Sequence, residues 1–146
     1  MADAAAGGVE GLLAAARLRI ERLEPEAAWT AASSGDALIV DIRSEDERGR
    51  DGVVPGALHV PRTVLEWRVD PASGWHNPRI GGRDSRLLLL CSEGFSSSLA
   101  AATLVDLGFA RAGDVIGGFG AWRRAGLPTA VSNGRPDGLP GMGPPD

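Results

Sequence analysis

The 146-residue sequence contains no lysine, no tyrosine and only one cysteine, and these absences exclude several kinds of chemistry. Without lysine the chain can form no Schiff base on a lysine amine and no P-loop of the nucleotide-binding type. A single cysteine excludes an internal disulfide, and two histidines, His59 and His76, without a cysteine cluster do not indicate a zinc site. We therefore expect no metal, no organic cofactor and a reducing, cytoplasmic environment.

Long apolar runs and a strong charge of either sign are also lacking. No stretch approaches the length of a membrane span, and Asp3 and Glu10 stand where a signal peptide would carry basic residues. The formal net charge of −4 argues against nucleic acid binding. We expect neither a membrane nor a nucleic acid as partner. The high content of Ala, Gly and Arg is typical of a GC-rich bacterial genome.

Short apolar segments alternate with helical patterns, which predicts an α/β domain with a parallel sheet. Turn signals and apolar periodicity define the elements. Strands are expected at residues 20–23, 38–42, 57–60, 87–90 and 115–116. Helices are expected within 1–19, 25–35, 64–69 and 99–107 and in a short segment through Trp122, with a long loop over 70–85.

We divide the chain into three parts. Residues 1–19 form an N-terminal helical extension that lies on the domain or, alternatively, serves as a partner-binding arm. Residues 20–128 form the α/β domain, and residues 129–146 form a Gly/Pro-rich tail that is expected to be disordered because few large apolar residues are present to bury. Within the domain, the mixed charge run 43–48 is expected to be a solvated helical turn.

Three further residues of the domain are expected to have structural roles. Asp41 and Arg43 should pair and hold the end of a strand to its loop. Trp122 is expected in the core.

Cys91 stands at a position where α/β proteins place a nucleophile. It follows the apolar run 87–90, which predicts a central parallel strand, and precedes the polar turn 92–98 that leads into a helix. Ligands bind in the crevice beyond the carboxyl ends of such strands. Backbone N–H groups and the positive end of the helix favour thiolate over thiol. We interpret Cys91 as a nucleophile; the alternative is a small buried core residue.

Four ordered landmarks resemble the single-domain rhodanese family, over about residues 20–128. The first three are residues 41–43, 52–61 and 91–98. The fourth consists of residues 117–122 together with 125–128. The resemblance implies a rhodanese-like parallel five-stranded sheet flanked by helices. In that family the cysteine receives sulfane sulfur as a persulfide and passes it to a nucleophilic acceptor. The whole chain also resembles a bacterial subgroup encoded near, or fused to, cysteine dioxygenases.

The resemblance assigns site residues by motif match. Cys91 is the catalytic sulfur carrier, and Arg62 and Trp67 are candidates for a wall of the site, although packing or solvated surface is the alternative for both. The substrate-binding cradle consists of Ser92, Glu93, Gly94, Phe95, Ser96 and Ser97.

The sequence departs from the family pattern at the loop. Ser92 and Ser96 stand where arginines often attract thiosulfate, and Val53 replaces a histidine, which leaves Cys91 without a His partner. Glu93 adds an anion: two unit charges about 5 Å apart at an effective dielectric near 20 repel by roughly 3 kcal/mol. We therefore expect a penalty for a dianionic donor, unless Glu93 points outward or bonds loop amides.

The resemblance implies a sulfurtransferase that carries sulfur from a persulfide or thiosulfate donor through a Cys91 persulfide. Because no second cysteine is present, the acceptor must be external: a low-molecular-weight thiol, cyanide in an assay, or the thiol of a partner protein. One alternative is a phosphatase or arsenate reductase, whose loop is closed by arginine as C-x5-R, but the residue six after Cys91 is Ser97. The other alternative is a non-catalytic binding module of the same fold.

Overall fold

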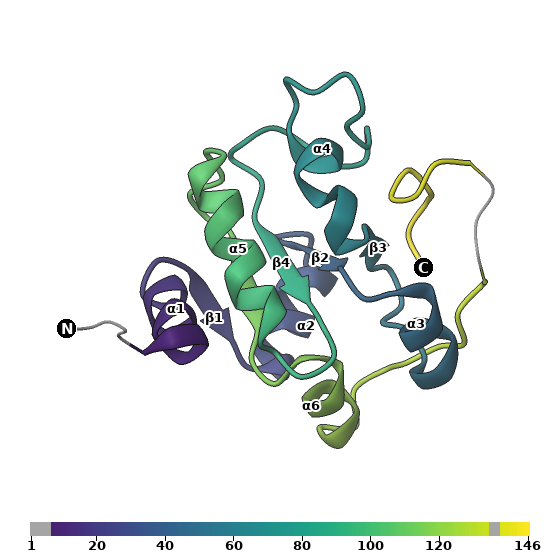
Figure 1. Ribbon diagram of the computed structural model, residues 1–146. Helices are drawn as coiled ribbons and strands as arrows, with labels where there is room; N and C mark the ends of the chain where they lie inside the picture. Colours follow the sequence, from purple (N-terminus) through teal and green to yellow (C-terminus); the bar gives the residue numbers. More distant parts are fainter. Residues whose placement is uncertain (1–6, 135–137) are drawn as a thin grey trace.

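The computed structural model describes residues 7–134 and 138–146. At its centre lies a five-stranded sheet with the strand order β1-β5-β4-β2-β3, and its strand pairings are parallel (Figure 1). The strands are β1 (Glu21–Leu23), β2 (Leu38–Asp41), β3 (Leu58–His59), β4 (Leu87–Leu90) and β5 (Gly113–Val115). The predicted α/β class and the five-stranded parallel sheet flanked by helices are confirmed.

Helices cover both faces of this sheet. They are α1 (Gly8–Arg17), α2 (Pro25–Ser33), α3 (Glu45–Asp51), α4 (Leu65–Val69), α5 (Ser96–Asp106) and α6 (Gly118–Arg124), with a 3-10 turn at Arg62–Val64. Local signals set some of these boundaries. Pro25 occupies the first turn of α2, and Ser44 caps α3 in a reciprocal capping box with Glu47.

The central strand β4 is buried on both faces. Because successive side chains of a strand point to opposite faces, Leu87 and Leu89 pack into one core with Leu104 of α5. Leu88 and Leu90 pack into the other core, which contains Trp122 and other residues of α2 and α6. The carboxyl end of β4, where Cys91 follows, is therefore held from both sides of the sheet.

Helix α1 packs along α5 (Figure 1). Leu13 and Ala16 are its buried residues, while residues 1–6 lie outside the described part of the chain. No helix within the described residues is both long and apolar enough to cross a lipid bilayer.

The charge run after β2 forms α3, but it is not a solvated turn throughout. Arg43 and Arg48 are each only 2% exposed. Arg43 donates to both carboxylate oxygens of Asp41, at 3.0 and 2.8 Å, which confirms the predicted pairing. Arg48 donates to the same carboxylate at 3.2 Å. The expectation of solvation was wrong for these arginines because the buried Asp41 at the end of β2 requires cationic partners.

The tail, predicted to be disordered, lies against the domain instead. Ala130 pairs with Val53 in an antiparallel bridge. Near the end of the chain, the N–H of Asp146 donates to the carbonyl of Ala57, and its own carbonyl accepts from the N–H of Gly56, both at 2.8 Å. Backbone hydrogen bonds of this kind need no large apolar side chain, so composition does not reveal them.

Side chains of the domain also hold the tail. Asn77 donates from its amide to the carbonyls of Gly141 and Gly143, at 3.0 and 3.2 Å, and Arg68 donates to the carbonyl of Pro140 at 2.7 Å. Both donors are almost completely buried. The tail therefore satisfies polar groups that would otherwise lack protein partners, and only residues 135–137 of it lie outside the described residues.

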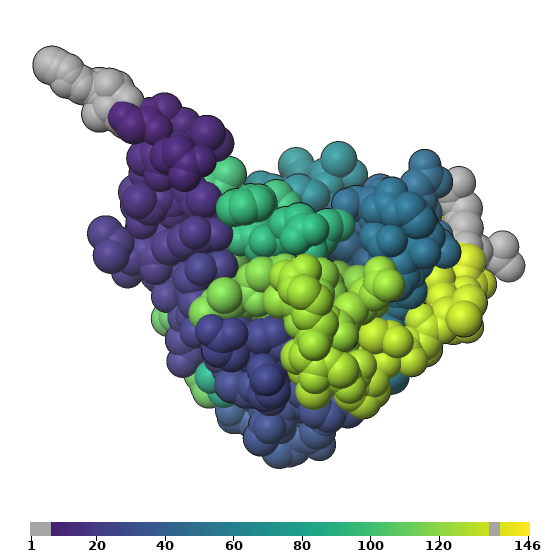
Figure 2. All heavy atoms as spheres, turned by 90° about the horizontal axis from the view of Figure 1, so that it is seen from below, coloured from purple at the N-terminus to yellow at the C-terminus, as the bar shows by residue number. Residues whose placement is uncertain are grey.

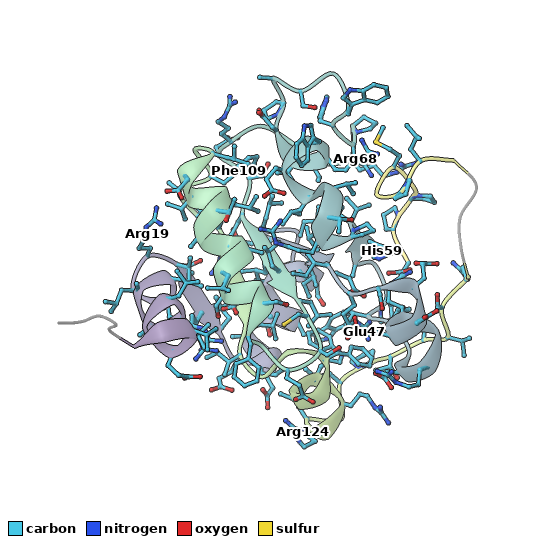
Figure 3. All side chains as sticks on the ribbon, in the orientation of Figure 1. Arg19, Glu47, His59, Arg68, Phe109 and Arg124 are labelled. Carbon is cyan, nitrogen blue, oxygen red and sulfur yellow. The ribbon has the colours of Figure 1, made fainter. Side chains whose placement is uncertain are left out.

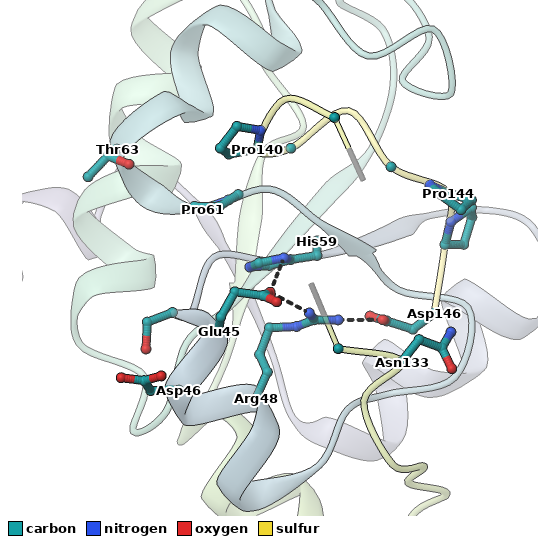
Figure 4. Close-up of a pocket in the computed structure, with 16 residues that line it drawn as sticks. Glu45, Asp46, Arg48, His59, Pro61, Thr63, Asn133, Pro140, Pro144 and Asp146 are labelled. Atoms are coloured by element: carbon teal, nitrogen blue, oxygen red, sulfur yellow. Dashed lines mark hydrogen bonds and ion pairs between the residues drawn. The ribbon is translucent and has the colours of Figure 1, made fainter. Parts of the chain in front are cut away.

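An ion-pair chain joins the tail to α3. His59 contacts Glu45, Glu45 accepts from Arg48, and Arg48 pairs with Asp146, along the edge of a cavity of about 480 Å³ (Figure 4). The residues described as lining this cavity come from α3, the β3 region and the tail and do not include Cys91.

Removal of residues 138–146 is expected to lower the free energy of unfolding by about 2 to 4 kcal/mol, because buried donors on Arg48, Arg68 and Asn77 lose their partners. Such a loss corresponds to a fall in melting temperature of roughly 5 to 10 °C. Thermal unfolding of the truncated and full chains measures this. Asp146→Asn should give part of the loss and Asp46→Asn, on the rim of the same cavity, almost none. A fall below about 2 °C on truncation would contradict the docking.

Candidate active site

Cys91 directly follows β4 and precedes α5, at the carboxyl edge of the sheet. Its side chain is nearly buried, and the N–H of Gly94 donates to Sγ over 3.1 Å. Gly94 has a left-handed φ of 84°, which turns the loop back over the sulfur. This geometry shows one loop amide directed at the sulfur.

The loop rests on the start of α6. The N–H groups of Phe119 and Gly120 donate to the carbonyls of Cys91 and Ser92, at 2.8 and 3.0 Å. A side chain at Gly118 would place its Cβ 2.4 Å from the Cys91 carbonyl oxygen, so only glycine allows this approach. The start of α6 therefore packs directly against the backbone of the loop that holds the sulfur.

A polar chain runs beneath the sulfur into the sheet. The Cys91 thiol donates to Ser97 Oγ at 3.3 Å, and Ser97 donates to Asp114 Oδ2 at 2.8 Å. Ser98 donates to the same oxygen at 2.7 Å, and Arg22 binds both carboxylate oxygens, at 2.9 and 3.3 Å. Asp114 is completely buried in β5. The four hydrogen bonds, one from each serine hydroxyl and two from the Arg22 guanidinium, stabilise its buried negative charge.

The other side of the loop is tied to α3. Ser92 Oγ donates to Glu47 Oε2 at 2.6 Å, and Glu47 also caps the start of its own helix at Ser44. The hydrogen bond from Ser92 lowers the pKa of Glu47 below its ordinary value. Figure 3 shows Glu47 below the end of β4. The charge run that was expected only to be solvated thus holds one edge of the predicted cradle.

Glu93 is exposed and turned toward α6. Its Oε2 lies 3.2 Å from the point that a Cβ on Gly120 would occupy, and Arg124 Nη1 lies 3.3 Å from the same point. Arg124 is at the outer end of α6 (Figure 3). The Glu93 anion therefore has a cation beside it, which moderates the repulsion expected from the sequence.

A cleft of about 490 Å³ borders this side of the loop. Its lining combines loop residues with charged residues of α3 and α6: Arg50, Asp51, Ser92, Glu93, Phe119, Gly120, Arg123 and Arg124. Figure 2, viewed from below relative to Figure 1, shows the green loop and start of α5 between α1 (purple) and α3 (blue).

The remaining predicted site residues are placed as follows. Phe95 and Ser96 are exposed on the loop and at the first position of α5, whereas Ser97 is fully buried. Arg62 pairs with Glu66 one turn along the chain at 2.9 Å, and the Trp67 side chain is largely exposed. Among the described contacts, none joins Arg62 or Trp67 to the loop of residues 91–97, so the geometry gives no support for a site wall there.

Sequence reasoning missed Glu47, Asp114, Arg17 and Arg22 as neighbours of the loop. Asp114 carried a usable signal, since an acid within a short buried strand requires a partner. The two arginines gave no local signal. In residues 7–134 and 138–146, no group of three His, Cys, Asp or Glu side chains is placed to hold a metal ion.

The chain is similar to known proteins over most of its length. The model of the rhodanese-like domain matches residues 24–125. A sulfurtransferase of Allochromatium vinosum is 31% identical over 103 residues, covering 70% of this chain and 87% of that protein. A thiosulfate sulfurtransferase GlpE of Actinobacillus succinogenes is 30% identical over 112 residues, covering 77% and 92%.

Two solved structures share the fold. A protein of unknown function from Rhodopseudomonas palustris, described as a possible tyrosine phosphatase, is 39% identical with a TM-score of 0.77 and covers 84% of this chain and 93% of that one. A polysulfide-sulfur transferase of Wolinella succinogenes is 23% identical with a TM-score of 0.68, covering 85% and 88%. The chain belongs to the rhodanese-like domain family, and its named relatives support a sulfurtransferase activity in general.

Proposed function

We propose that the protein transfers sulfane sulfur from a donor to a thiol acceptor through a persulfide on Cys91. The observation that carries the proposal is the geometry of the sulfur itself. Cys91 Sγ lies at the carboxyl edge of the sheet, inside a glycine-containing loop, with the Gly94 N–H only 3.1 Å away. A backbone donor at this distance stabilises negative charge on the cysteine sulfur without a histidine base.

The reaction is a two-step exchange. The Cys91 thiolate attacks the outer sulfur of a persulfide or thiosulfate; the new S–S bond forms as the donor bond breaks, and the donor leaves with the electron pair as a thiolate or sulfite. An acceptor thiolate then attacks the terminal sulfur, and Cys91 leaves as the thiolate. Charge and electrons balance in each step, so no cofactor is required.

The phosphatase alternative is favoured by one observation, the description of the similar Rhodopseudomonas protein. Phosphatases of this fold need a loop closed by arginine to bind the transferred phosphoryl group. Here the corresponding residue is Ser97, which is buried and bonded to Asp114. This loop geometry supports sulfur transfer over phosphoryl transfer.

The proposal is tested by incubating the purified protein with thiosulfate, glutathione persulfide, 3-mercaptopyruvate and a phosphate ester. Intact mass is expected to rise by about 32 Da, one sulfur atom, with at least one sulfur donor. A thiol added afterwards should remove the added mass and release product. Phosphate release without any sulfur adduct would reject the proposal in favour of the phosphatase.

Donor choice is expected to depend on the charges around the cleft. Glu93→Gln removes a negative charge from the cleft that also contains Arg123 and Arg124. Ser96→Arg adds a positive charge at the start of α5. Each change should raise kcat/KM for thiosulfate by about five- to thirtyfold relative to a persulfide donor.

The gains should shrink at high salt, because the attraction is between charges in contact with solvent. Glu26→Gln on α2 alters the net charge equally but lies outside the cleft lining, and it serves as the control. An unchanged donor ratio in both loop variants would show that these charges do not act on the bound donor.

A further inference from the structure

Two arginines that precede the segment matched by the family model reach the Cys91 loop. Arg17 is the last residue of α1 and Arg22 lies in the middle of β1, both outside residues 24–125. Arg17 Nη2 donates to the carbonyl oxygen of Gly94 at 2.8 Å, and Arg22 Nη2 donates to the same oxygen at 3.4 Å. Two cations thus hold the residue whose N–H donates to Cys91 Sγ.

Arg17 contacts this region at two further points. Its Nε donates to Ser98 Oγ at 3.0 Å, in the first turn of α5. Its guanidinium carbon also lies 5.9 Å from the centre of the Phe95 ring, within the range of a cation–π contact. A single side chain of α1 therefore links three residues of the loop and the helix that follows it.

The position of the Gly94 carbonyl also determines the direction of the backbone N–H that follows it. Because a trans peptide directs its N–H opposite to its C=O, fixing the Gly94 oxygen also fixes the direction of the Phe95 N–H. That amide is the next backbone donor of the predicted cradle. Donors around a reacting atom must be placed accurately, since an error of about 1 Å can reduce the rate about a hundredfold.

Arg22 has a second role beneath the sulfur. It compensates the completely buried Asp114 carboxylate, which is separated from Cys91 Sγ by the Ser97 hydroxyl alone. An uncompensated anion at this depth would oppose the charge of a thiolate. Arg22 therefore allows Asp114 to orient Ser97 and Ser98 without placing an unpaired negative charge near the nucleophile.

We propose that Arg17 and Arg22 are positioning residues for the Cys91 loop, so that α1 and β1 form part of the catalytic unit. This proposal rests on the proposed function, because it takes Cys91 to be the reacting group. The arginines act through the Gly94 carbonyl, Ser98 and Asp114.

The test compares Arg17→Met with Arg19→Met in the full chain. Arg19 also joins the N-terminal segment to α5, through Asp106, but that residue is at the opposite end of α5, about 15 Å along the helix from Ser96. Figure 3 shows Arg19 at the end of α1 away from α6. The two variants thus remove equal charge from the same interface, and only Arg17→Met disturbs the loop.

Two readouts are needed: the pH dependence of Cys91 alkylation by iodoacetamide, and kcat/KM for sulfur transfer. In Arg17→Met, we expect alkylation at neutral pH to slow about threefold, its profile to move to higher pH, and kcat/KM to fall about tenfold. Arg17→Lys, which can make a single hydrogen bond to Gly94, should be intermediate. Arg19→Met should stay within about twofold of the original protein.

Equal reactivity of Cys91 in the Arg17 and Arg19 variants would overturn the proposal. Arg22→Met alone leaves a buried charge on Asp114, so Arg22 is tested in a background that lacks this charge. The double variant Arg22→Met/Asp114→Asn should be alkylated more slowly than Asp114→Asn, because the hydrogen bond to the Gly94 carbonyl is lost, and equal rates would overturn the role of Arg22. If the original protein transfers no sulfur from any donor, the proposed function fails, whereas alkylation still decides whether the arginines position the loop.

Discussion

Cys91→Ser is expected to abolish sulfur transfer and leave the fold unchanged. A serine hydroxyl is nearly isosteric with the thiol and can take the hydrogen bonds from Gly94 and to Ser97, so we expect a stability change below about 1 kcal/mol. It cannot form a persulfide, however, and its proton is lost far less readily than that of a thiol. The loss in kcat should therefore exceed about a thousandfold.

Intact mass and turnover measure this result, and thermal unfolding checks the fold. The variant should show no sulfur adduct with any donor that modifies the original protein. Cys91→Ala provides a second comparison, because it removes the hydrogen-bonding atom as well as the nucleophile. Sulfur transfer at the original rate in either variant would contradict the proposed mechanism, since Cys91 is the single cysteine of the chain.

The elements around Cys91 could be predicted from sequence because their signals are local. The all-leucine run of β4 indicates a strand buried on both faces, and Pro25 marks the start of α2. The turn after β4 then places Cys91 at the ligand-binding edge of a parallel sheet. These inferences need only neighbouring residues, which explains their success.

The supports of the loop could not be predicted, because they join residues far apart in the sequence. Arg17 is 77 residues from Gly94, and Arg22 is 92 residues from Asp114. No periodicity or spacing connects such pairs before the fold is known. The docking of the tail was missed for a different reason: composition measures apolar burial, whereas the tail is held by backbone carbonyls and one carboxylate.

Gly118→Ala is expected to reduce kcat/KM about a hundredfold. The Cβ of alanine would lie 2.4 Å from the Cys91 carbonyl oxygen and 2.8 Å from the Gly94 nitrogen, which are backbone atoms of the loop itself. Relief of these contacts requires a shift of about 1 Å, and it displaces the N–H that donates to the cysteine sulfur. The left-handed φ of 63° adds strain of about 1 kcal/mol.

Gly126→Ala provides the matched control, because this glycine also has a left-handed φ, 72°, yet no atom lies within 4 Å of the position its Cβ would take. It should lose similar stability from strain while kcat/KM stays within about twofold. Thermal unfolding gives the stability of both variants, and from it the folded fraction at the assay temperature, which is used to correct the rates. The control measures the effect of the backbone strain alone, without a close contact to the loop. If Gly118→Ala retains the original kcat/KM after the correction, the contact between α6 and the loop does not determine the geometry around Cys91.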